Sequence, residues 1–289
     1  MEIRTLEYFM AIKREGNMLK ASKYLHLTQP TLSRQIRDLE KELGIKLIER
    51  CGRNTKLTEE GILFSERAEN ILELINKSKK EVLLNSNDIK GEIYIGAAEV
   101  SSIKKFLNIL YKLQSKYKDV IVNITSGDQD DVYRDLDSGI IDFGVVFGDI
   151  DNEKYNNVKI KTDIKWGILC RKDKKTSKTK SISQKELSTL PLIVSRQIIK
   201  NNPNTIFKTK LNIIGTYNLL YNASLMAEIG MGYVLCLSDI INTTGKSNLC
   251  FTQLTNQPKF NLHIIWKKQT IYSKPVLKLI ETLQKNKLN

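Results

Sequence analysis

The sequence predicts an α+β protein made of three successive parts. We expect a winged helix-turn-helix unit over residues 1–58, a linker helix with a polar hinge over 59–90, and an α/β domain over 91–289. Three observations predict this division: a capped pair of short helical segments near the N-terminus, a heptad-spaced apolar run after it, and alternating strand and helix patterns from there on. A chain of 289 residues can supply each part with its own core.

The first two helices are indicated by apolar periodicity. Leu6, Phe9 and Ile12 recur at three-residue spacing and share one helix face, and Gly16 is typical of a helix end. A second, shorter helix is expected over residues 18–25, followed by a tight turn.

A third helix begins with a strong start signal. The hydroxyl of Thr28 can accept a backbone N–H, and Pro30 falls in the first turn, where a missing N–H costs nothing. Leu32, Ile36 and Leu39 follow a 4,3 spacing and should face the core. The opposite face of this helix is then polar and basic.

That polar, basic face predicts contact with DNA. Residues at the start of such a helix can approach base edges in the major groove, and arginines farther along can reach phosphates or a guanine edge. An ordinary amphipathic helix with solvated arginines is the alternative, but the cap, the proline and the basic face occur together here. The candidate DNA-contacting residues of this helix are Gln29, Pro30, Thr31, Ser33, Arg34 and Arg37.

Two short extended segments around a Gly-Arg-Asn turn follow within residues 45–58, and they have the pattern of a wing. Arg50 and Arg53 would lie beside the third helix, where a narrow minor groove or phosphates attract guanidinium groups. They complete the set of candidate DNA-contacting residues.

The stretches 16–36 and 39–50 closely resemble the signature of LysR-type transcriptional regulators, with a departure at Ile48, where the family usually has Phe. This resemblance implies a DNA-binding head, pairing of two copies through the linker helix, and often tetramers. It also implies an effector domain like the periplasmic binding proteins, which holds a small inducer, generally a metabolite, between two lobes. RNA polymerase is a further candidate partner.

The linker helix carries a dimerisation pattern of its own. After Thr58, positions 64, 68, 71, 75, 78 and 82 step 4,3,4,3,4, which is a heptad seam, and residues 85–88 form a polar hinge. Pairing with a second copy is expected, and packing on the chain's own C-terminal domain is the alternative. A dimer would place two heads on an inverted repeat in double-stranded DNA. The candidate dimerisation residues are Phe64, Ala68, Ile71, Ile75 and Val82.

The remaining residues alternate between strand and helix patterns, which is typical of α/β domains. Lobe I is expected over about 91–161 and 266–289, and lobe II over about 162–265. The expected strands are 92–96, 120–125, 141–147, 166–170, 192–195, 211–215, 233–237 and 262–267, and the expected helices are 101–116, 129–138, 184–190, 218–229 and one at the C-terminus.

Ligands of open α/β sheets bind at the carboxyl ends of the strands, so residues at strand ends are the candidates for effector contact. A turn or capping role is the alternative for each of them. The candidates are Glu99, Ser101, Ser126, Phe147, Ser195, Arg196 and Asn218. Many LysR-type regulators have a small hydroxyl residue directly after the glycine at the first helix. This chain has Glu99-Val100-Ser101, so the resemblance carries over no ligand class.

The chain is basic, with a net charge of +14 and a pI near 9.4. Residues 1–58 hold 12 Lys/Arg against 7 Asp/Glu, and residues 59–90 hold 5 against 7, so most of the excess lies outside the head. The lysine-rich stretch 154–180 is better explained as a solvated surface than as a second DNA site. Net basicity therefore does not carry the DNA prediction.

Nothing in the sequence indicates an enzyme, a metal site or a cofactor. Only two histidines, His26 and His263, are present, and no nucleophile elbow, P-loop or H-E-x-x-H motif occurs. A ligand-binding protein that keeps a degenerate head is a further alternative. No run of ~18 apolar residues and no apolar N-terminal region occur, so we expect a cytoplasmic protein.

The cysteines show no C-x-x-C pairing, which argues against metal binding. They are Cys51, Cys170, Cys236 and Cys250. Buried, inert thiols are expected, and a redox role for Cys236 or Cys250 is the alternative.

Overall fold

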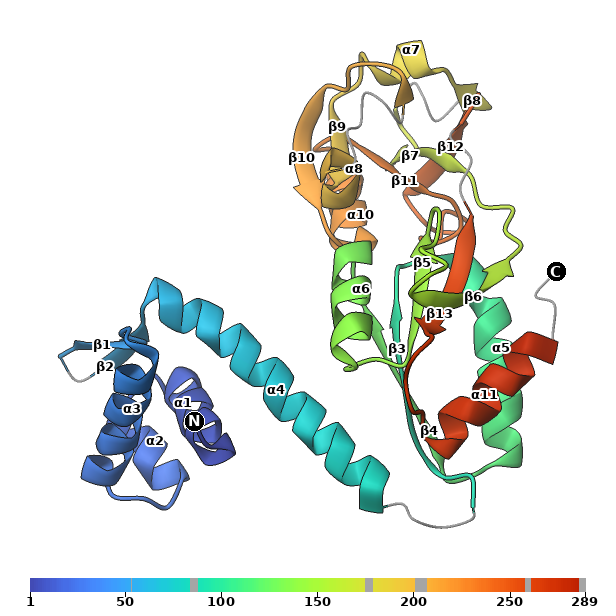
Figure 1. Cartoon of the computed structure of the whole chain (residues 1–289). Helices are drawn as coiled ribbons and strands as arrows, with labels where there is room; N and C mark the ends of the chain where they lie inside the picture. Colours follow the sequence, from blue (N-terminus) through green and yellow to red (C-terminus); the bar gives the residue numbers. More distant parts are fainter. Residues whose placement is uncertain (53, 84–87, 175–178, 201–206, 258–260, 286–289) are drawn as a thin grey trace. The chain divides into compact units, whose positions relative to one another are not determined.

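Figure 1 shows a computed structural model of the whole chain. The structure describes residues 1–52, 54–83, 88–174, 179–200, 207–257 and 261–285. The chain divides into two compact units, Met1–Asn85 and Ser86–Asn289. The predicted order of helix-turn-helix head, long helix and two α/β lobes is confirmed, and the long helix belongs to the first unit.

The first unit contains four helices and a small hairpin among its described residues. They are α1 (Ile3–Glu15), α2 (Met18–Tyr24), α3 (Gln29–Leu43), the antiparallel strands β1 (Ile48–Cys51) and β2 (Asn54–Leu57), and α4 (Glu59–Leu83). The first three helices and the segment before β1 share one apolar core. It is formed by Phe9, Ala11, Ile12, Met18, Ala21, Leu32, Ile36, Leu39 and Leu47.

The ends of the head helices follow the predicted signals. Gly16 adopts a left-handed conformation with φ 60° directly after α1, which a glycine does without strain. The Thr28 hydroxyl accepts a hydrogen bond from the main-chain N–H of Thr31 at 3.3 Å, with Pro30 in the first turn of α3. These caps fix where α1 ends and where α3 begins, and the predicted start at Thr28 is confirmed.

The first turns of α4 pack on α1. The ring of Phe64 meets that of Phe9 edge to face, with centroids 5.3 Å apart, and Ala68 is fully buried. Ala68 therefore belongs to the head's own interior, and placing it in the dimerisation seam was wrong. Phe64 is half-buried, and the part of its ring that packs on Phe9 is not available to a second copy. The heptad spacing marked a real apolar face, but its N-terminal end is covered by the same chain.

Lobe I of the second unit is built on a five-stranded sheet of order β4-β3-β5-β13-β6. Strand β3 is parallel to β4 and β5, whereas β13 is antiparallel to β5 and β6. Its elements are β3 (Gly91–Ala97), a 3-10 turn η1 (Ser101–Ile103), α5 (Lys104–Lys116), β4 (Val120–Ser126), α6 (Gln129–Ser138), β5 (Phe143–Phe147), β6 (Tyr155–Ile160), β13 (Leu262–Lys267) and α11 (Lys274–Lys285).

Lobe II is built on a six-stranded sheet of order β10-β9-β11-β7-β12-β8, in which β9, β10 and β11 are parallel. Its elements are β7 (Trp166–Arg171), β8 (Ser181–Ile182), α7 (Gln184–Leu187), β9 (Leu192–Ser195), α8 (Arg196–Lys200), β10 (Ile213–Tyr217), α10 (Leu220–Glu228), β11 (Tyr233–Leu237) and β12 (Leu249–Leu254). Each lobe has its own apolar clusters on the faces of its sheet.

The chain returns from lobe II to lobe I earlier in the sequence than expected. The whole of β13 pairs within the lobe I sheet, with Leu262 opposite both Phe147 and Ile160. The expected boundary between residues 265 and 266 would cut this strand, so it is corrected to the segment between β12 and β13. Strands β6, β8 and β12 were not predicted either, because their polar residues hide the alternation of a half-buried strand.

Candidate DNA interface and effector cavity

The start of α3 presents a polar surface. Gln29, Pro30, Thr31, Arg34 and Arg37 are all exposed, while Leu32, Ile36 and Leu39 are buried at the opposite side of the helix. The Thr31 hydroxyl lies 2.8 Å from that of Thr28, so the capping bond also orients this side chain. The first turn is thus held in place by its own cap.

Ser33 departs from the expectation. Its side chain is only 7% exposed, because position 33 lies three residues before buried Ile36 and shares the inner stripe of α3. Ser33 is therefore the least exposed of the candidate DNA-contacting residues of α3, and its contact with DNA stays a prediction.

The two arginines of α3 are only lightly held. Arg34 lies 3.8 Å from Asp38 in an exposed ion pair one helical turn along, and Arg37 donates from Nε to the main-chain oxygen of Ser33 at 3.3 Å. Exposed ion pairs of this kind contribute little to stability. Both guanidinium groups are therefore available to an anionic partner at small energetic cost.

The hairpin β1–β2 is the predicted wing. Arg50 pairs with Thr55 through the main chain in this hairpin. The side chain of Arg50, and Arg53 as a whole, lie outside the described part of the chain.

Glu40 joins α3 to the wing. Its carboxylate is 5% exposed and accepts hydrogen bonds from the main-chain N–H of Leu47 at 2.9 Å and of Ile48 at 3.2 Å. The ammonium group of Lys46 lies 2.7 Å from its second oxygen. Burial on its own raises the pKa of Glu40, but these three hydrogen bonds outweigh it and hold the pKa below its ordinary value. The wing is thus fixed to α3 by a charged, buried acceptor.

A cavity of about 180 Å³ lies between the two lobes of the second unit. It opens where strand ends of both sheets face each other, after β3, β4 and β5 of lobe I and after β9, β10 and β11 of lobe II. A buried water needs roughly 10–15 Å³ by a comparable measure, so the cavity has room for a small metabolite. Its lining consists of Ala98, Glu99, Gly127, Asp128, Gln129, Phe147, Trp166, Ser195, Gln197, Ile198, Tyr217, Asn218, Leu219, Leu220, Cys236, Leu237 and Ile240.

Four of the seven candidate effector residues line this cavity, and three do not. Those that do are Glu99, Phe147, Ser195 and Asn218. Ser101 lies in the 3-10 turn away from it, Ser126 is an exposed strand end, and Arg196 is exposed. In the last two cases the following residues, at 127–128 and 197, line the cavity instead.

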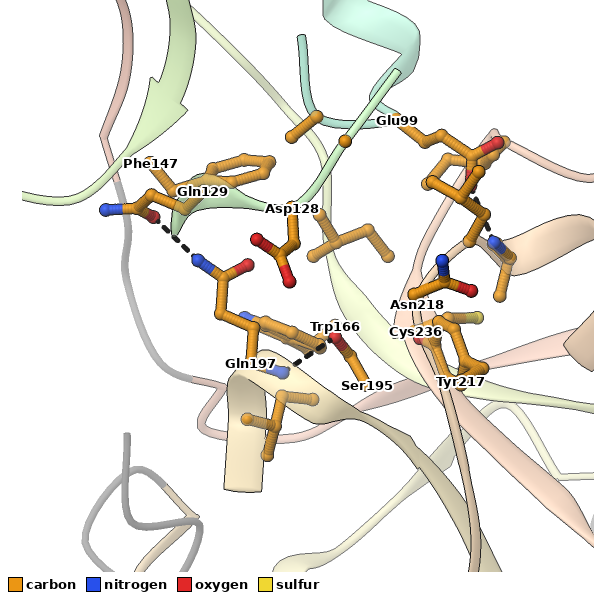
Figure 2. A pocket seen from close by; sticks show the side chains of 17 residues that line it. Glu99, Asp128, Gln129, Phe147, Trp166, Ser195, Gln197, Tyr217, Asn218 and Cys236 are labelled. Atoms are coloured by element: carbon orange, nitrogen blue, oxygen red, sulfur yellow. Dashed lines mark hydrogen bonds between the residues drawn. The ribbon is translucent and has the colours of Figure 1, made fainter. Parts of the chain in front are cut away.

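Three contacts join the lobes around the cavity. Glu99, just after β3, accepts a hydrogen bond from the main-chain N–H of Leu220 at the start of α10, at 2.6 Å. Gln197 donates from Nε2 to Oε1 of Gln129 at 3.0 Å, and Figure 2 shows both bonds as dashed lines. Lys200 forms an ion pair with Asp130. The two lobes therefore contact each other through residues that follow the ends of strands in both sheets.

Sequence reasoning missed several lining residues. The sequence did contain a signal that could have identified Asp128: Asp128 and Asp131 have the spacing of a capping box, and they form one at the start of α6, shortly after a strand. Tyr217 had no such signal, because it ends a strand that was expected to stop at residue 215, and Trp166 had none, because it begins a strand, whereas the candidates were sought where strands end. The missed polar and aromatic lining residues are Asp128, Gln129, Trp166, Gln197, Tyr217 and Cys236.

Two lining groups are unsuited to ionisation. Burial raises the pKa of the Tyr217 phenol well above its ordinary value, and its hydroxyl donates to the main-chain oxygen of Leu235 at 2.8 Å. Burial also raises the pKa of the Cys236 thiol to about 12. Tyr217 and Cys236 therefore present neutral side chains to the cavity.

His263 and two of the cysteines, Cys170 and Cys250, lie outside the cavity lining. His263 lies mid-strand in β13, with Nδ1 3.0 Å from Oδ1 of Asn157, and burial lowers its pKa. The sulfur atoms of Cys170 and Cys250 lie 3.5 Å apart on paired strands. Among the described residues no group of three His, Cys, Asp or Glu side chains could hold a metal ion, and no described helix has the length and apolarity to cross a membrane.

Two family models match the chain. The bacterial regulatory helix-turn-helix protein, lysR family, matches residues 3–62, and the LysR substrate binding domain matches residues 86–287. Among curated relatives, the chain is 31% identical to the HTH-type transcriptional regulator TfdT of Cupriavidus pinatubonensis, over 50% of this chain and 63% of that protein. It is 33% identical to ClcR of Pseudomonas putida, over 50% of this chain and 49% of that protein. The matched part thus spans about half to two thirds of these relatives.

A longer alignment exists with a protein of Thalassiosira pseudonana named "Probable RuBisCO transcriptional regulator", 26% identical over 83% of this chain and 82% of that protein. Among solved structures, CbnR, a LysR family transcriptional regulator, superposes with a TM-score of 0.74 at 20% identity over 98% of each chain. HinK from Pseudomonas aeruginosa superposes with a TM-score of 0.56 at 19% identity over 98% of this chain and 97% of that one. At these identities the superpositions concern the fold. Because the two family models account for both units, the chain belongs to the LysR family of DNA-binding transcriptional regulators, with a helix-turn-helix head followed by an effector-binding domain.

Proposed function

We propose that this protein reads an inverted-repeat operator in double-stranded DNA and that a small molecule bound between its lobes controls this activity. The observation that carries the DNA part is the exposed, capped first turn of α3, with two weakly paired arginines on the same side of the helix. Such a surface suits insertion into a major groove.

The proposed DNA-contacting residues have different roles according to their position. Gln29, Pro30 and Thr31 lie in the first turn, where side chains of a recognition helix approach base edges. Arg34 and Arg37 lie farther along and suit phosphate oxygens or a guanine edge. We assign Arg50 and Arg53 of the wing to the neighbouring minor groove or backbone on the basis of their sequence positions.

A second copy is the proposed occupant of the exposed apolar stripe of α4. Leu63, Ile71, Leu74 and Val82 are 59%, 40%, 39% and 72% exposed, and their spacing of 8, 3 and 8 residues keeps them on one helix face. Ile75 lies beside them, whereas Phe64 is half-buried against Phe9 and Ala68 is buried within the head. The proposed dimer thus keeps Ile71, Ile75 and Val82 from the heptad pattern.

A tetramer would need a second contact surface, and the effector domain offers one. Tyr221, Leu225 and Ile229 are 66%, 43% and 74% exposed at four-residue spacing along and just after α10. Leu107 and Tyr111 of α5 are 39% and 71% exposed. Exposed apolar stripes of this kind are typical of contacts between protein copies.

The effector part rests on the cavity between the lobes. A ligand that contacts both lobes favours one relative arrangement of them, and it can control DNA binding only through a difference in affinity between arrangements. We place the protein in the cytoplasm, where a bacterial regulator meets DNA, and RNA polymerase is the proposed partner of an operator-bound regulator.

Genome-wide footprinting of the bound protein tests this function. The expected result is a small set of protected inverted repeats that the Thr31→Ala variant no longer protects. Arg4→Ala is the matched control, because Arg4 is an exposed residue of α1 outside the proposed interface. Protection without sequence preference, or a pattern unchanged by Thr31→Ala, would contradict the proposal.

A further inference from the structure

Two of the three helices whose first residues line the cavity, α10 and α6, begin at a carboxylate, whereas α8 begins after Ser195, whose hydroxyl accepts the N–H of Gln197 at 3.3 Å. Glu99 occupies the start of α10 by accepting the N–H of Leu220, and Asp128 occupies the start of α6 by accepting the N–H of Asp131 at 3.0 Å. The partial positive charge at the start of α10 and of α6, which would attract an anionic ligand, is therefore already met by a carboxylate of the protein.

No positive side chain offsets these two carboxylates at the cavity wall. Among the described residues that line the cavity there is no lysine, arginine or histidine. Arg196 is exposed and does not line it, and Lys200, which also lies outside the lining, is paired with Asp130 and interacts more weakly with Asp128. A ligand carboxylate placed here would lie close to two like charges with no counter-ion, which is unfavourable.

The uncharged part of the wall suits an organic cation. The rings of Phe147, Trp166 and Tyr217 line the same cavity as the carboxylates. Aromatic faces attract ammonium and guanidinium groups when water is excluded. Figure 2 shows the Asp128 carboxylate turned into the cavity from the lobe I side. Its Oδ1 serves the α6 cap, which leaves Oδ2 oriented for a ligand.

The remaining lining residues define the other end of the ligand. Ile198, Leu219, Leu237 and Ile240 give the cavity an apolar region, and Asn218 adds an amide. A ligand that fills the space should therefore carry an apolar body next to its charged group.

We propose that the effector of this regulator is a small organic cation, with an ammonium or guanidinium group joined to an apolar body and no free carboxylate. Asp128 is its counter-ion, and Glu99 keeps anionic ligands out of the start of α10. This inference rests on the proposed effector function of the cavity and names its ligand class.

Probes that share a 2-phenylethyl body and differ in the charge of the attached group test the charge preference. The probes are 2-phenylethylamine, 2-phenylethanol and 3-phenylpropanoate, titrated at millimolar concentration into the full chain with calorimetry and thermal unfolding as readouts. The expected result is that the amine binds at least about tenfold more tightly than the carboxylate, with the alcohol between them. Tighter binding of the carboxylate would overturn the proposed ligand class.

Conservative variants test which residue causes the preference of the cavity for a cationic ligand. Asp128→Asn keeps a side chain that caps helices well, and Glu99→Gln keeps an acceptor for the N–H of Leu220, so both should fold. In Asp128→Asn the amine should bind about tenfold more weakly while the alcohol is unaffected. Asp135→Asn is the control, because it removes the same charge from α6 at a residue outside the cavity lining. Equal losses in Asp128→Asn and Asp135→Asn would overturn the role of Asp128.

The outcomes also separate this inference from the proposed function. If the carboxylate binds in the cavity and changes operator affinity, the protein is an effector-controlled regulator but the ligand class is wrong. If no probe of any charge binds or shifts thermal unfolding, and operator binding is unchanged throughout, both the ligand class and the effector role of the cavity are contradicted.

Discussion

The Glu40 carboxylate, on α3, accepts a hydrogen bond from the main-chain N–H of Leu47 at 2.9 Å. Leu47 is fully buried, and its own main-chain oxygen accepts from the N–H of Thr58 at 3.1 Å before α4 begins. A Cβ atom on Gly61 would lie 2.0 Å from that oxygen, so the close approach of α4 requires glycine there. One short segment therefore connects α3, the wing and the linker helix.

Replacing Glu40 tests this connection. Glu40→Ala leaves the buried N–H of Leu47 without its acceptor, and the head should lose about 2–3 kcal/mol of unfolding free energy. The measurement is hydrogen exchange of the α1 and α3 amides in the full chain at increasing urea. Lys46→Ala is the control: its side chain is 73% exposed, so its loss should cost less than about 1 kcal/mol. Equal losses in the two variants would contradict the account.

The stabilisation from Glu40 should depend on pH. Because the folded pKa of Glu40 is lowered, its contribution is fully present above the unfolded value of about 4.3 and is lost as the pH falls through the folded pKa. The stability difference between the wild type and Glu40→Gln should therefore shrink below about pH 4. A difference that stays constant down to about pH 2 would show that the charge of Glu40 is not involved.

The contact between Glu99 and Leu220 predicts a local change in dynamics. Glu99→Ala removes the acceptor for the first N–H of α10, so exchange of the Leu220 amide should become faster by about tenfold or more. Glu99→Gln keeps an acceptor at the same position and should preserve most of the protection. Hydrogen exchange with residue-level resolution distinguishes the two, and identical protection in Glu99→Ala and the wild type would mean that the lobes are not joined here.

The Cys236 thiol should be inert in the folded protein. With its pKa raised to about 12, almost no thiolate is present near neutral pH, and the side chain is only 3% exposed. Labelling with a maleimide at about pH 7.5 should modify the same number of thiols in the wild type and in Cys236→Ser, until urea unfolds the domain. Rapid labelling of Cys236 in the native state would instead support the redox alternative.

The apolar stripe of α4 predicts the oligomeric state. A charged side chain at Leu74 or Val82 would be buried against the second copy, so Leu74→Glu and Val82→Glu should shift the protein toward monomers in analytical ultracentrifugation. Asn76→Glu is the control, because Asn76 is exposed on the other side of the helix. Unchanged sedimentation of both Leu74→Glu and Val82→Glu would contradict pairing through α4.

Local sequence patterns were sufficient to predict the helices of the helix-turn-helix head. The start of α3 depends on Thr28 and Pro30, which act within one helical turn, and its core face depends on a spacing that only a helix satisfies. Ser33 shows the limit of this reasoning. A polar residue beside an apolar stripe can point either way, and only the packing of α3 on its neighbours decides that it is buried.

The surroundings of the linker helix and the lining of the cavity are set by tertiary contacts, and the spacing of residues in the sequence does not predict these contacts. Phe64 lies on a heptad seam, but the ring of Phe9 covers part of it within the same chain. At the cavity, the rule that ligands lie at strand ends identified Glu99 and Phe147, while Trp166 and Tyr217 depended on where two sheets face each other. A shift of two residues at a strand end separates Ser126 from Asp128, and sequence patterns do not resolve strand ends that finely.

The most direct test of a regulator that reads DNA through α3 is the salt dependence of its affinity for a footprinted operator and for a scrambled duplex. Thr31→Ala should cost about 1–3 kcal/mol on the operator only, whereas Arg37→Ala should weaken both duplexes alike and flatten the slope of log affinity against log salt by about one. If Thr31→Ala and Arg37→Ala bind both duplexes with the affinity and salt slope of the wild type, α3 is not the reading helix.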